Sequence, residues 1–376
     1  MEPFKNLINA GTVEAIARQL RRADASFASA RFRTLALTGL EALEFKARAQ
    51  HVCAALCATL PADFARAAEM IEASLAPMNS DDTPRASSRS SGLAGWAVWP
   101  LCEVVATRGL DDPARALRCL HALTQRHTAE WSIRPFIERH PALAFATLAT
   151  WATDPSGHVR RLVSEGSRPR LPWGLQLKGL IADPAPTLPL LLALQDDPSD
   201  YVRRSVANHL NDIAKDHPGV VVQWVTRHLS DASDHRRALL RHASRTLIKR
   251  GDPAMLKAWG LGQRLRGSAQ IALSASRIRV GDSFSLCVTL NSSAARAQKL
   301  VIDYAVHHVK ANGDTSAKVF KGWGIDLAAR ETRTLVKTHS MRVITTRRYH
   351  AGAHAVDLRV NGEVLASAPF ELTLAD

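Results

Sequence analysis

The chain has 376 residues, enough for two or three domains of about 100–200 residues each. Hydrophobic residues make up 46% and charged residues 22%, which excludes a mainly disordered chain. The net charge is +14, and the excess extends into residues 268–376, which hold 14 basic and 9 acidic side chains. This balance fits a polyanion contacted by both halves, and equally an ordinary basic surface.

Nothing in the sequence indicates a membrane or a secreted protein. No apolar run approaches the roughly 18 residues that span a bilayer, and Lys5, Glu14 and Arg18 are unlike a signal peptide. The five cysteines form no C-x-x-C pair, which disfavours a zinc module or a disulfide framework. We therefore expect a cytoplasmic protein without a membrane contact.

The first two thirds of the chain have helical periodicity. Within residues 1–75, Val13, Ile16 and Leu20 recur at helical spacing. Residues 78–92 contain five serines and a proline, which predicts a mobile loop. Residues 93–250 are helical again, and Asp-Pro pairs at 112–113, 154–155, 183–184 and 197–198 predict helix starts.

Three segments are copies of one unit. Asp154-Pro-Ser-Gly-His-Val-Arg-Arg-Leu-Val matches Asp197-Pro-Ser-Asp-Tyr-Val-Arg-Arg-Ser-Val, and a shorter copy begins at Asp231. Helical repeats of this length resemble HEAT repeats, which stack into a solenoid. We predict an all-α HEAT-like repeat domain over residues 1–255.

The pattern changes after a glycine-containing linker at 256–267. Short alternating segments follow, such as Phe284-x-Leu286-x-Val288-x-Leu290, with turn signals at Asn312-Gly313-Asp314, Gly322 and Asn361-Gly362. This pattern predicts an all-β immunoglobulin-like sandwich over residues 268–376.

Each repeat carries an Arg-Arg pair early in a helix, and stacking places these pairs in a row. Such a row suits a series of phosphates, although a structural role, with each arginine paired to a neighbouring aspartate, has about equal weight. The pairs are Arg160 with Arg161, Arg203 with Arg204, and Arg236 with Arg237.

Carboxylates lie close to these arginines. Glu165 and Asp212 project from neighbouring repeat helices, on a surface otherwise built for anions. A structural salt bridge is one explanation. The functional alternative is a carboxylate that faces a cationic group within a polyanion, such as an alkylated base.

Longer motifs resemble one family. The segments Thr128-Ala-Glu-Trp-Ser-Ile-Arg-Pro-Phe-Ile137, His158–Trp173 and Tyr201–Asp212 resemble the AlkC branch of the AlkC/AlkD DNA alkylation-repair glycosylases. So does Gly39-Leu-Glu-Ala-Leu-Glu-Phe-Lys-Ala-Arg48, and the resemblance covers about residues 1–250. The tail is similar to the immunoglobulin-like domain of some members, with Thr345-Thr-Arg-Arg-Tyr349 as the recognisable piece.

The resemblance implies a DNA N-glycosylase that needs no cofactor or metal and excises 3-methyladenine and 3-methylcytosine without fully extruding the base. The matching acids are Glu130, Glu165 and Asp212. A carboxylate can stabilise an oxocarbenium-like sugar and orient the attacking water, a role we assign first to Glu165, with Glu130 beside it.

Further residues are expected to contact the lesion or the double-stranded DNA. Trp131 and Trp173 are candidates for the lesion pocket, although each could be core. The candidate DNA contacts are Arg160, Arg161, Arg168, Arg170, Arg203, Arg204, Arg347 and Arg348. A non-catalytic HEAT-repeat scaffold that binds DNA or protein is the alternative, and we expect a monomer in either case.

Overall fold

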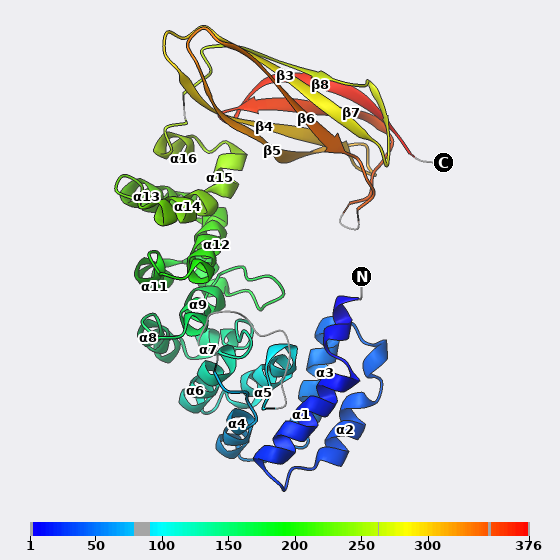
Figure 1. Cartoon of the computed structure of the whole chain (residues 1–376), viewed down its shortest axis with the longest axis vertical. Coiled ribbons are helices and arrows are strands. Elements are labelled where there is room, and N and C mark those ends of the chain that lie inside the picture. Colours follow the sequence, from blue (N-terminus) through cyan, green and yellow to red (C-terminus); the bar gives the residue numbers. More distant parts are fainter. Residues whose placement is uncertain (1–2, 79–90, 262, 345–346, 375–376) are drawn as a thin grey trace. The chain divides into compact units, whose positions relative to one another are not determined.

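The computed structural model describes residues 3–78, 91–261, 263–344 and 347–374 (Figure 1). Contacts divide the chain into two compact units, Met1–Asp216 with Ser233–Ala243, and His217–Ala232 with Ser244–Asp376. The predicted loop at 78–92 lies mostly outside the described residues. Within those residues, no helix combines the length and apolarity needed to cross a membrane.

The N-terminal segment of the first unit is helical, as predicted. Asn9 and Thr12 form a reciprocal capping box at the start of α1, and Val13, Ile16 and Leu20 are buried on one face. The elements are η1 (Phe4–Leu7), α1 (Ala10–Ala23), α2 (Ser29–Leu37), η2 (Leu40–Ala42), α3 (Phe45–Cys57) and α4 (Phe64–Ala73).

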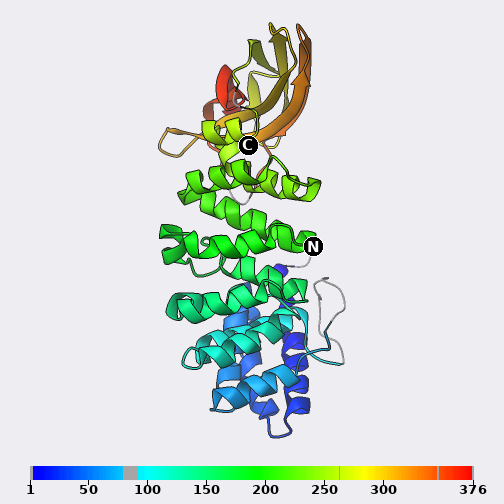
Figure 2. The same cartoon turned by 90° about the vertical axis from the view of Figure 1, so that its left-hand side faces the viewer.

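The repeats follow as stacked helices. Helices α9 and α12, which hold the matching Asp154 and Asp197 copies, pack against each other, and α12 packs against α14. Figures 1 and 2 show α6, α8 and α11 as a second layer beside α9 and α12. The elements are η3 (Gly95–Val98), α5 (Trp99–Arg108), α6 (Pro113–Thr124), α7 (Arg134–Arg139), α8 (Pro141–Trp151), α9 (Gly157–Gly166), α10 (Lys178–Ala182), η4 (Ala185–Thr187), α11 (Leu188–Leu194), α12 (Asp200–Asp216) and α14 (Asp234–Ala243).

The second unit begins with helices α13 (Pro218–His228), α15 (Arg245–Arg250) and α16 (Pro253–Ala258). Gly251 ends α15 in the left-handed region, with φ +75°. Its backbone lies so close to Gly362 that a Cβ on Gly362 would be 2.6 Å from the Gly251 Cα. The last helices therefore pack on a turn of the β domain, and the predicted boundary at 255 stays a prediction.

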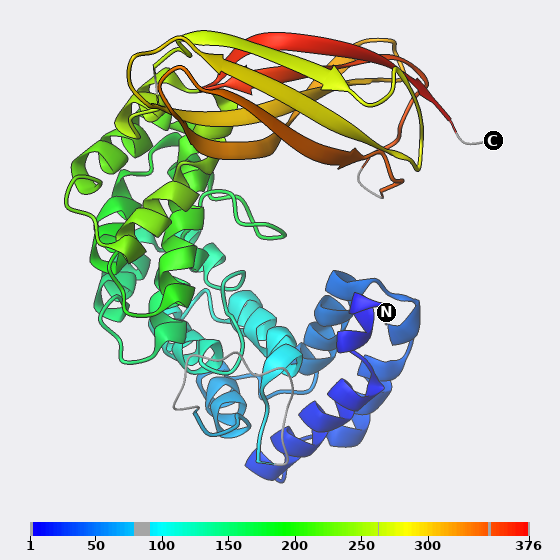
Figure 3. The same ribbon diagram turned by 45° about the horizontal axis from the view of Figure 1, so that its top comes forward.

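Two sheets form the β domain, which confirms the predicted sandwich (Figure 3). Their strand orders are β1-β3-β6 and β2-β8-β7-β4-β5, so β2 and β5 are opposite edges of the larger sheet. Inward residues of both sheets, among them Phe284, Leu286, Tyr304 and Val356, share one core. The strands are β1 (Gly267–Leu273), β2 (Arg277–Arg279), β3 (Ser283–Ser292), β4 (Gln298–Val309), β5 (Thr315–Leu327), β6 (Thr332–Ser340), β7 (Gly352–Val360) and β8 (Glu363–Thr373).

One predicted turn is wrong. Asn312-Gly313 and Asn361-Gly362 do connect strands, but Gly322 lies inside β5. It lies beside the irregularity between Ile302 and Asp303, where a Cβ would approach the Ile302 carbonyl oxygen to 2.4 Å. The glycine is needed there for close backbone approach rather than for a turn.

Candidate active site

Three carboxylates from separate segments meet in one network in the first unit. Glu130 lies in the turn before α7, Glu165 on α9 and Asp212 on α12. All three are buried. Buried carboxylates require compensating partners, and arginines supply them here.

Arg161 and Arg168 join the acids in series. Arg161 Nη1 contacts Glu130 Oε2 at 2.6 Å, and Arg161 Nη2 lies 3.6 Å from Glu165 Oε1. Arg168 Nη1 contacts Glu165 Oε1 at 2.6 Å, and Arg168 Nε donates to Asp212 Oδ2 at 2.8 Å. Positive and negative charges therefore alternate from Glu130 to Asp212.

The carboxylate oxygens of the three acids differ in whether they already accept a hydrogen bond or ion pair. Ser205 donates to Glu165 Oε2 at 2.6 Å, and Lys215 contacts Asp212 Oδ1 at 2.8 Å. Both oxygens of Glu165 and both of Asp212 thus have a donor. The Oε1 of Glu130 accepts no hydrogen bond from any residue that the structure describes.

The network keeps Glu165 ionised. Burial alone would raise the pKa of Glu165, but the charges of Arg161 and Arg168 and the hydrogen bonds from Ser205 and Arg168 outweigh it and hold that pKa below its usual range. A carboxylate with a lowered pKa is a weak proton acceptor and a stable negative charge. Burial, followed by the charge of Arg161, lowers the pKa of nearby His127 to about 4.

Arg134 and Gly166 position the backbone segments that carry these acids. The fully buried Arg134 donates through Nη1 to the carbonyls of Gly166 at 2.8 Å and Arg168 at 2.7 Å, and through Nε to Leu175. A Cβ on Gly166 would lie 2.5 Å from Ile133 Cγ2, so glycine lets the turn that carries Glu130 approach α9. Sequence analysis gave neither residue a role, although both lie inside the quoted motifs.

A pocket of about 260 Å³ adjoins the network. Of the predicted site residues, Glu130, Trp131 and Arg161 line it. Glu165, Asp212 and Trp173 do not. Sequence analysis missed the other lining residues, which come from distant segments: Trp96, Thr124, Arg126, His127, Thr128, His158 and Tyr201.

Trp173 lies outside this pocket, on the loop between α9 and α10. Its side chain is 62% exposed, and its backbone has φ +64°, which is unusual for a bulky residue. Its ring stacks beside Trp131, with centroids 6.4 Å apart and planes 24° apart. Of the two tryptophans predicted for the lesion pocket, only Trp131 lines this pocket.

The arginine pairs do not form the uniform row expected from the sequence. Arg160 and Arg203 each donate to the carbonyls of the Asp-Pro turn in their own repeat, and Arg160 also pairs with the Asp197 carboxylate at 2.7 Å. Arg161 is bound to Glu130, whereas Arg204 is exposed and contacts Asp200 at 2.8 Å. For Arg160 and Arg203 this geometry favours the structural role weighed above.

The remaining candidate DNA contacts lie elsewhere. Arg170 forms a bidentate pair with Asp216, both contacts at 2.8 Å. In the β domain, Arg348 is exposed, and the half-buried Arg347 donates to His308 Nε2.

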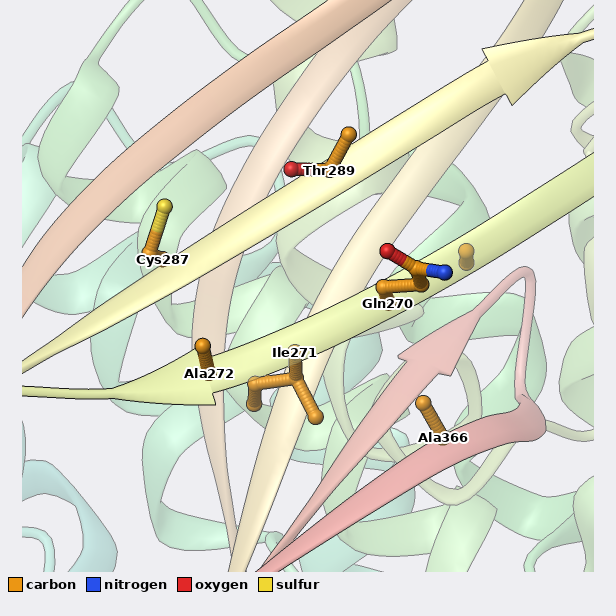
Figure 4. Close-up of a pocket in the computed structure, with 7 residues that line it drawn as sticks. Gln270, Ile271, Ala272, Cys287, Thr289 and Ala366 are labelled. Atoms are coloured by element: carbon orange, nitrogen blue, oxygen red, sulfur yellow. The ribbon is translucent and has the colours of Figure 1, made fainter.

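A second hollow, of about 330 Å³, lies on strands β1 and β3 (Figure 4). Gln270, Cys287 and Thr289 line it together with small apolar residues, and no charged side chain does. This hollow therefore offers no charged group to an ionic ligand.

Comparisons with known proteins agree with this architecture. A family model described as the C-terminal Ig-like domain of the uncharacterised protein YhaZ matches residues 267–374. The uncharacterized protein YhaZ of Bacillus subtilis is 34% identical, over 99% of this chain and 100% of its own length. The solved structure of the Pseudomonas fluorescens alkylpurine DNA glycosylase AlkC, bound to DNA containing an abasic site analog, is 35% identical with a TM-score of 0.89, over 99% of this chain and 100% of that one. The chain therefore belongs to the AlkC-like family, in the branch that carries a C-terminal immunoglobulin-like domain.

Proposed function

We propose that this chain is a DNA N-glycosylase that excises cationic alkylated bases, 3-methyladenine and 3-methylcytosine, from double-stranded DNA. The observation that carries the proposal is the buried series of Glu130, Glu165 and Asp212 beside a pocket lined by Glu130. The likeness to an alkylpurine DNA glycosylase over the full chain supports it.

The chemistry needs no acid to protonate the leaving group. Methylation already gives the base a positive charge, so the main barrier is formation of an oxocarbenium-like sugar. A fixed negative charge close to the sugar lowers that barrier, and a carboxylate can also orient or deprotonate the attacking water.

The hydrogen bonds suggest how these tasks are divided. From the sequence, Glu165 was predicted both to stabilise the sugar charge and to orient the water. Its two carboxylate oxygens, however, already accept hydrogen bonds from Arg168 and Ser205. We propose that Glu165 supplies the fixed negative charge. Glu130, which lines the pocket and has one unoccupied oxygen, would contact the water or the sugar.

The pocket suits a planar cation. Trp96 and Trp131 line the pocket with Glu130, and a cationic base is attracted both by ring faces and by a carboxylate. The Tyr201 ring in the same lining already holds the Arg161 guanidinium 5.1 Å from its centre. A neutral base is attracted less strongly than a cationic base by the ring faces and by the carboxylate. This difference would select damaged bases, which we propose are excised without full extrusion.

The arginines predicted to contact DNA also differ in their proposed roles. We propose that Arg170, Arg204, Arg347 and Arg348, which are exposed or half-exposed, contact phosphates. Arg161 and Arg168 would act through the acids, and the chain would work as a monomer.

Release of free base tests the proposal. Methylated duplex is incubated with excess enzyme, and 3-methyladenine and 3-methylcytosine are quantified for the parent, E130Q, E165Q and the control E138Q, an exposed acid on α7. We expect the single-turnover rate to fall at least 100-fold in E130Q and E165Q, with DNA binding retained, and to be unchanged in E138Q.

The rival scaffold makes the opposite prediction. A parent protein that binds DNA but releases no base would reject the glycosylase, and the carboxylates would then be structural partners of the arginines. Full activity in E130Q with loss in E165Q would instead reject the proposed division of tasks.

A further inference from the structure

The cysteines of the chain differ in how accessible they are. Cys53, Cys102 and Cys119 are buried. Cys57 and Cys287 are half-buried, so part of each side chain faces solvent. Cys57 lies one helical turn after Cys53 on α3, and residues at this spacing share one face of a helix. The proposed glycosylase chemistry uses neither thiol of this pair.

Arg108, at the end of α5, has no acid to balance its charge. Helix α5 packs against α3, and Arg108 Nη2 donates to the carbonyls of Pro61 and Ala62 in the loop after α3, the second at 2.7 Å. Arg108 Nη1 is buried without a hydrogen-bond partner, and no residue that the structure describes forms an ion pair with this guanidinium. A buried cationic nitrogen without a partner is unfavourable, so an anion close to Arg108 is stabilised.

Cys57 is the titratable group on which this charge acts. A hydrogen bond from the Cys53 thiol and the positive charge of Arg108 outweigh partial burial and lower the pKa of Cys57 to about 7. The same hydrogen bond, burial and the negative charges of Cys57 and Glu103 raise the pKa of Cys53. Near neutral pH the pair therefore holds a thiolate on Cys57 and a thiol on Cys53.

We propose that Cys57 is a peroxide-sensitive modification site, in which Arg108 and Cys53 stabilise the thiolate that reacts. A partly exposed thiolate beside a cation is typical of reactive cysteines, whereas structural cysteines are buried in apolar surroundings. The proposal holds whether or not the chain is a glycosylase.

The reaction with hydrogen peroxide is a two-electron oxidation of the Cys57 sulfur. The thiolate attacks one peroxide oxygen, an S–O bond forms as the O–O bond breaks, and hydroxide leaves and takes up a proton from solvent. The product is a sulfenic acid on Cys57. Cys53 remains a thiol because its pKa is raised, and a thiol is a poor nucleophile, so the reaction ends at the sulfenic acid.

Alkylation of the full chain by iodoacetamide measures the thiolate without an oxidant. Peptide mass spectrometry gives the rate at Cys57 and, in the same sample, at Cys287, whose hollow has no charged lining residue. We expect the rate at Cys57 to rise with pH around a midpoint of about 7. In R108Q that midpoint should rise by about 1 pH unit, whereas the rate at Cys287 should be unchanged.

Two substitutions of Cys53 separate its hydrogen bond from its packing. C53A removes the donor, so the midpoint for Cys57 should rise. In C53S the hydroxyl can still donate, and the midpoint should stay closer to that of the parent. Thermal melting checks that R108Q, C53A and C53S are folded.

Peroxide treatment then tests the modification itself. The full chain is treated with hydrogen peroxide at pH 7 in the presence of dimedone, which traps sulfenic acids. We expect more adduct on Cys57 than on Cys287. The adduct on Cys57 should fall about twofold in R108Q, because the smaller thiolate fraction is partly offset by a more nucleophilic sulfur.

Two results would overturn the proposal: a pH profile of Cys57 that is the same in the parent, R108Q and C53A, or equal dimedone labelling of Cys57 and Cys287. A disulfide between Cys53 and Cys57 in place of the adduct would overturn the proposed end product.

Discussion

Arg134 holds Arg168 in place through the backbone: Arg134 Nη1 donates to the Arg168 carbonyl at 2.7 Å. One buried arginine thus fixes the chain that presents another, whose own side chain binds Glu165 and Asp212. The position of the acid network therefore depends on Arg134, whose side chain donates only to backbone carbonyls among the described residues.

Replacing Arg134 should therefore disturb the loop after α9. In R134K, one ammonium cannot reach the separate carbonyls that the guanidinium satisfies, so we expect the free energy of unfolding to fall by ~3 kcal/mol. Urea denaturation of R134K measures this loss. The control R139K changes an exposed arginine on the same helix, and an equal loss in both variants would contradict the assignment.

Gly166 should tolerate no side chain. In G166A the new Cβ meets Ile133, and we expect a loss of ~2 kcal/mol in the free energy of unfolding. Removing that methyl group in I133A should make the added cost of G166A vanish, which a double-mutant cycle measures. In G179A the added Cβ meets nothing within 4 Å, so stability should not fall. A G166A cost that persists in the I133A background would disprove the steric explanation.

The stability contributed by Glu165 should depend on pH in a defined direction. Its folded pKa lies below the ordinary value of about 4.3. The contribution is therefore complete above that value and is lost as pH falls through the folded pKa. We expect E165Q to cost ~3 kcal/mol at pH 7, with the gap to the parent closing as the pH falls toward 3. A gap that is constant over this range would show that the charge of Glu165 is not the cause.

The stability contributed by His209 should be lost over a higher pH range than that contributed by Glu165. Its Nδ1 donates to the Ser164 carbonyl at 2.9 Å, and burial lowers its pKa to about 4. In the unfolded chain histidine titrates near 6.5, so stability that is present above that pH is lost as the pH falls toward 4. The parent should lose about 2 kcal/mol more than H209Q between pH 7 and pH 5. Parallel pH profiles for the two proteins would argue against a buried neutral imidazole.

His308 should act on DNA binding through Arg347. Leucine in H308L removes the acceptor. The slope of log affinity for undamaged duplex against log salt should therefore fall by up to about 1, the same fall that we expect for R347Q, with no further fall in H308L/R347Q. H308Q, whose amide oxygen can accept, should retain more of the slope. A slope in H308L that equals the parent's would show that Arg347 does not need this partner.

The sequence predicted most of the architecture because short-range patterns encode it. The Asp154 and Asp197 copies correspond to helices α9 and α12, and strand alternation anticipates the sandwich core. The meeting of Glu165 and Asp212 follows from their places on neighbouring repeat helices, although the two positions are not equivalent, and Arg168 joins them.

The rest depends on contacts between distant segments, which spacing does not encode. Asp197 as the partner of Arg160, and the carbonyls that bind Arg134, cannot be read from one helix. Trp173 was a sequence candidate for the lesion pocket, but its left-handed backbone and its exposure could not be predicted from residue type.

The contacts of Arg160 should restrict movement between two neighbouring repeats. Its guanidinium donates hydrogen bonds to the Asp-Pro turn of its own repeat and also forms an ion pair with the Asp197 carboxylate of the next repeat. Solenoids usually flex by small rotations between adjacent repeats. Here such a rotation would have to break a two-point ion pair, so the step from α9 to α12 is stiff. We therefore expect the ion pair to hold the spacing of Glu165 and Asp212 before any partner binds, and bending to be concentrated in repeats without such an ion pair.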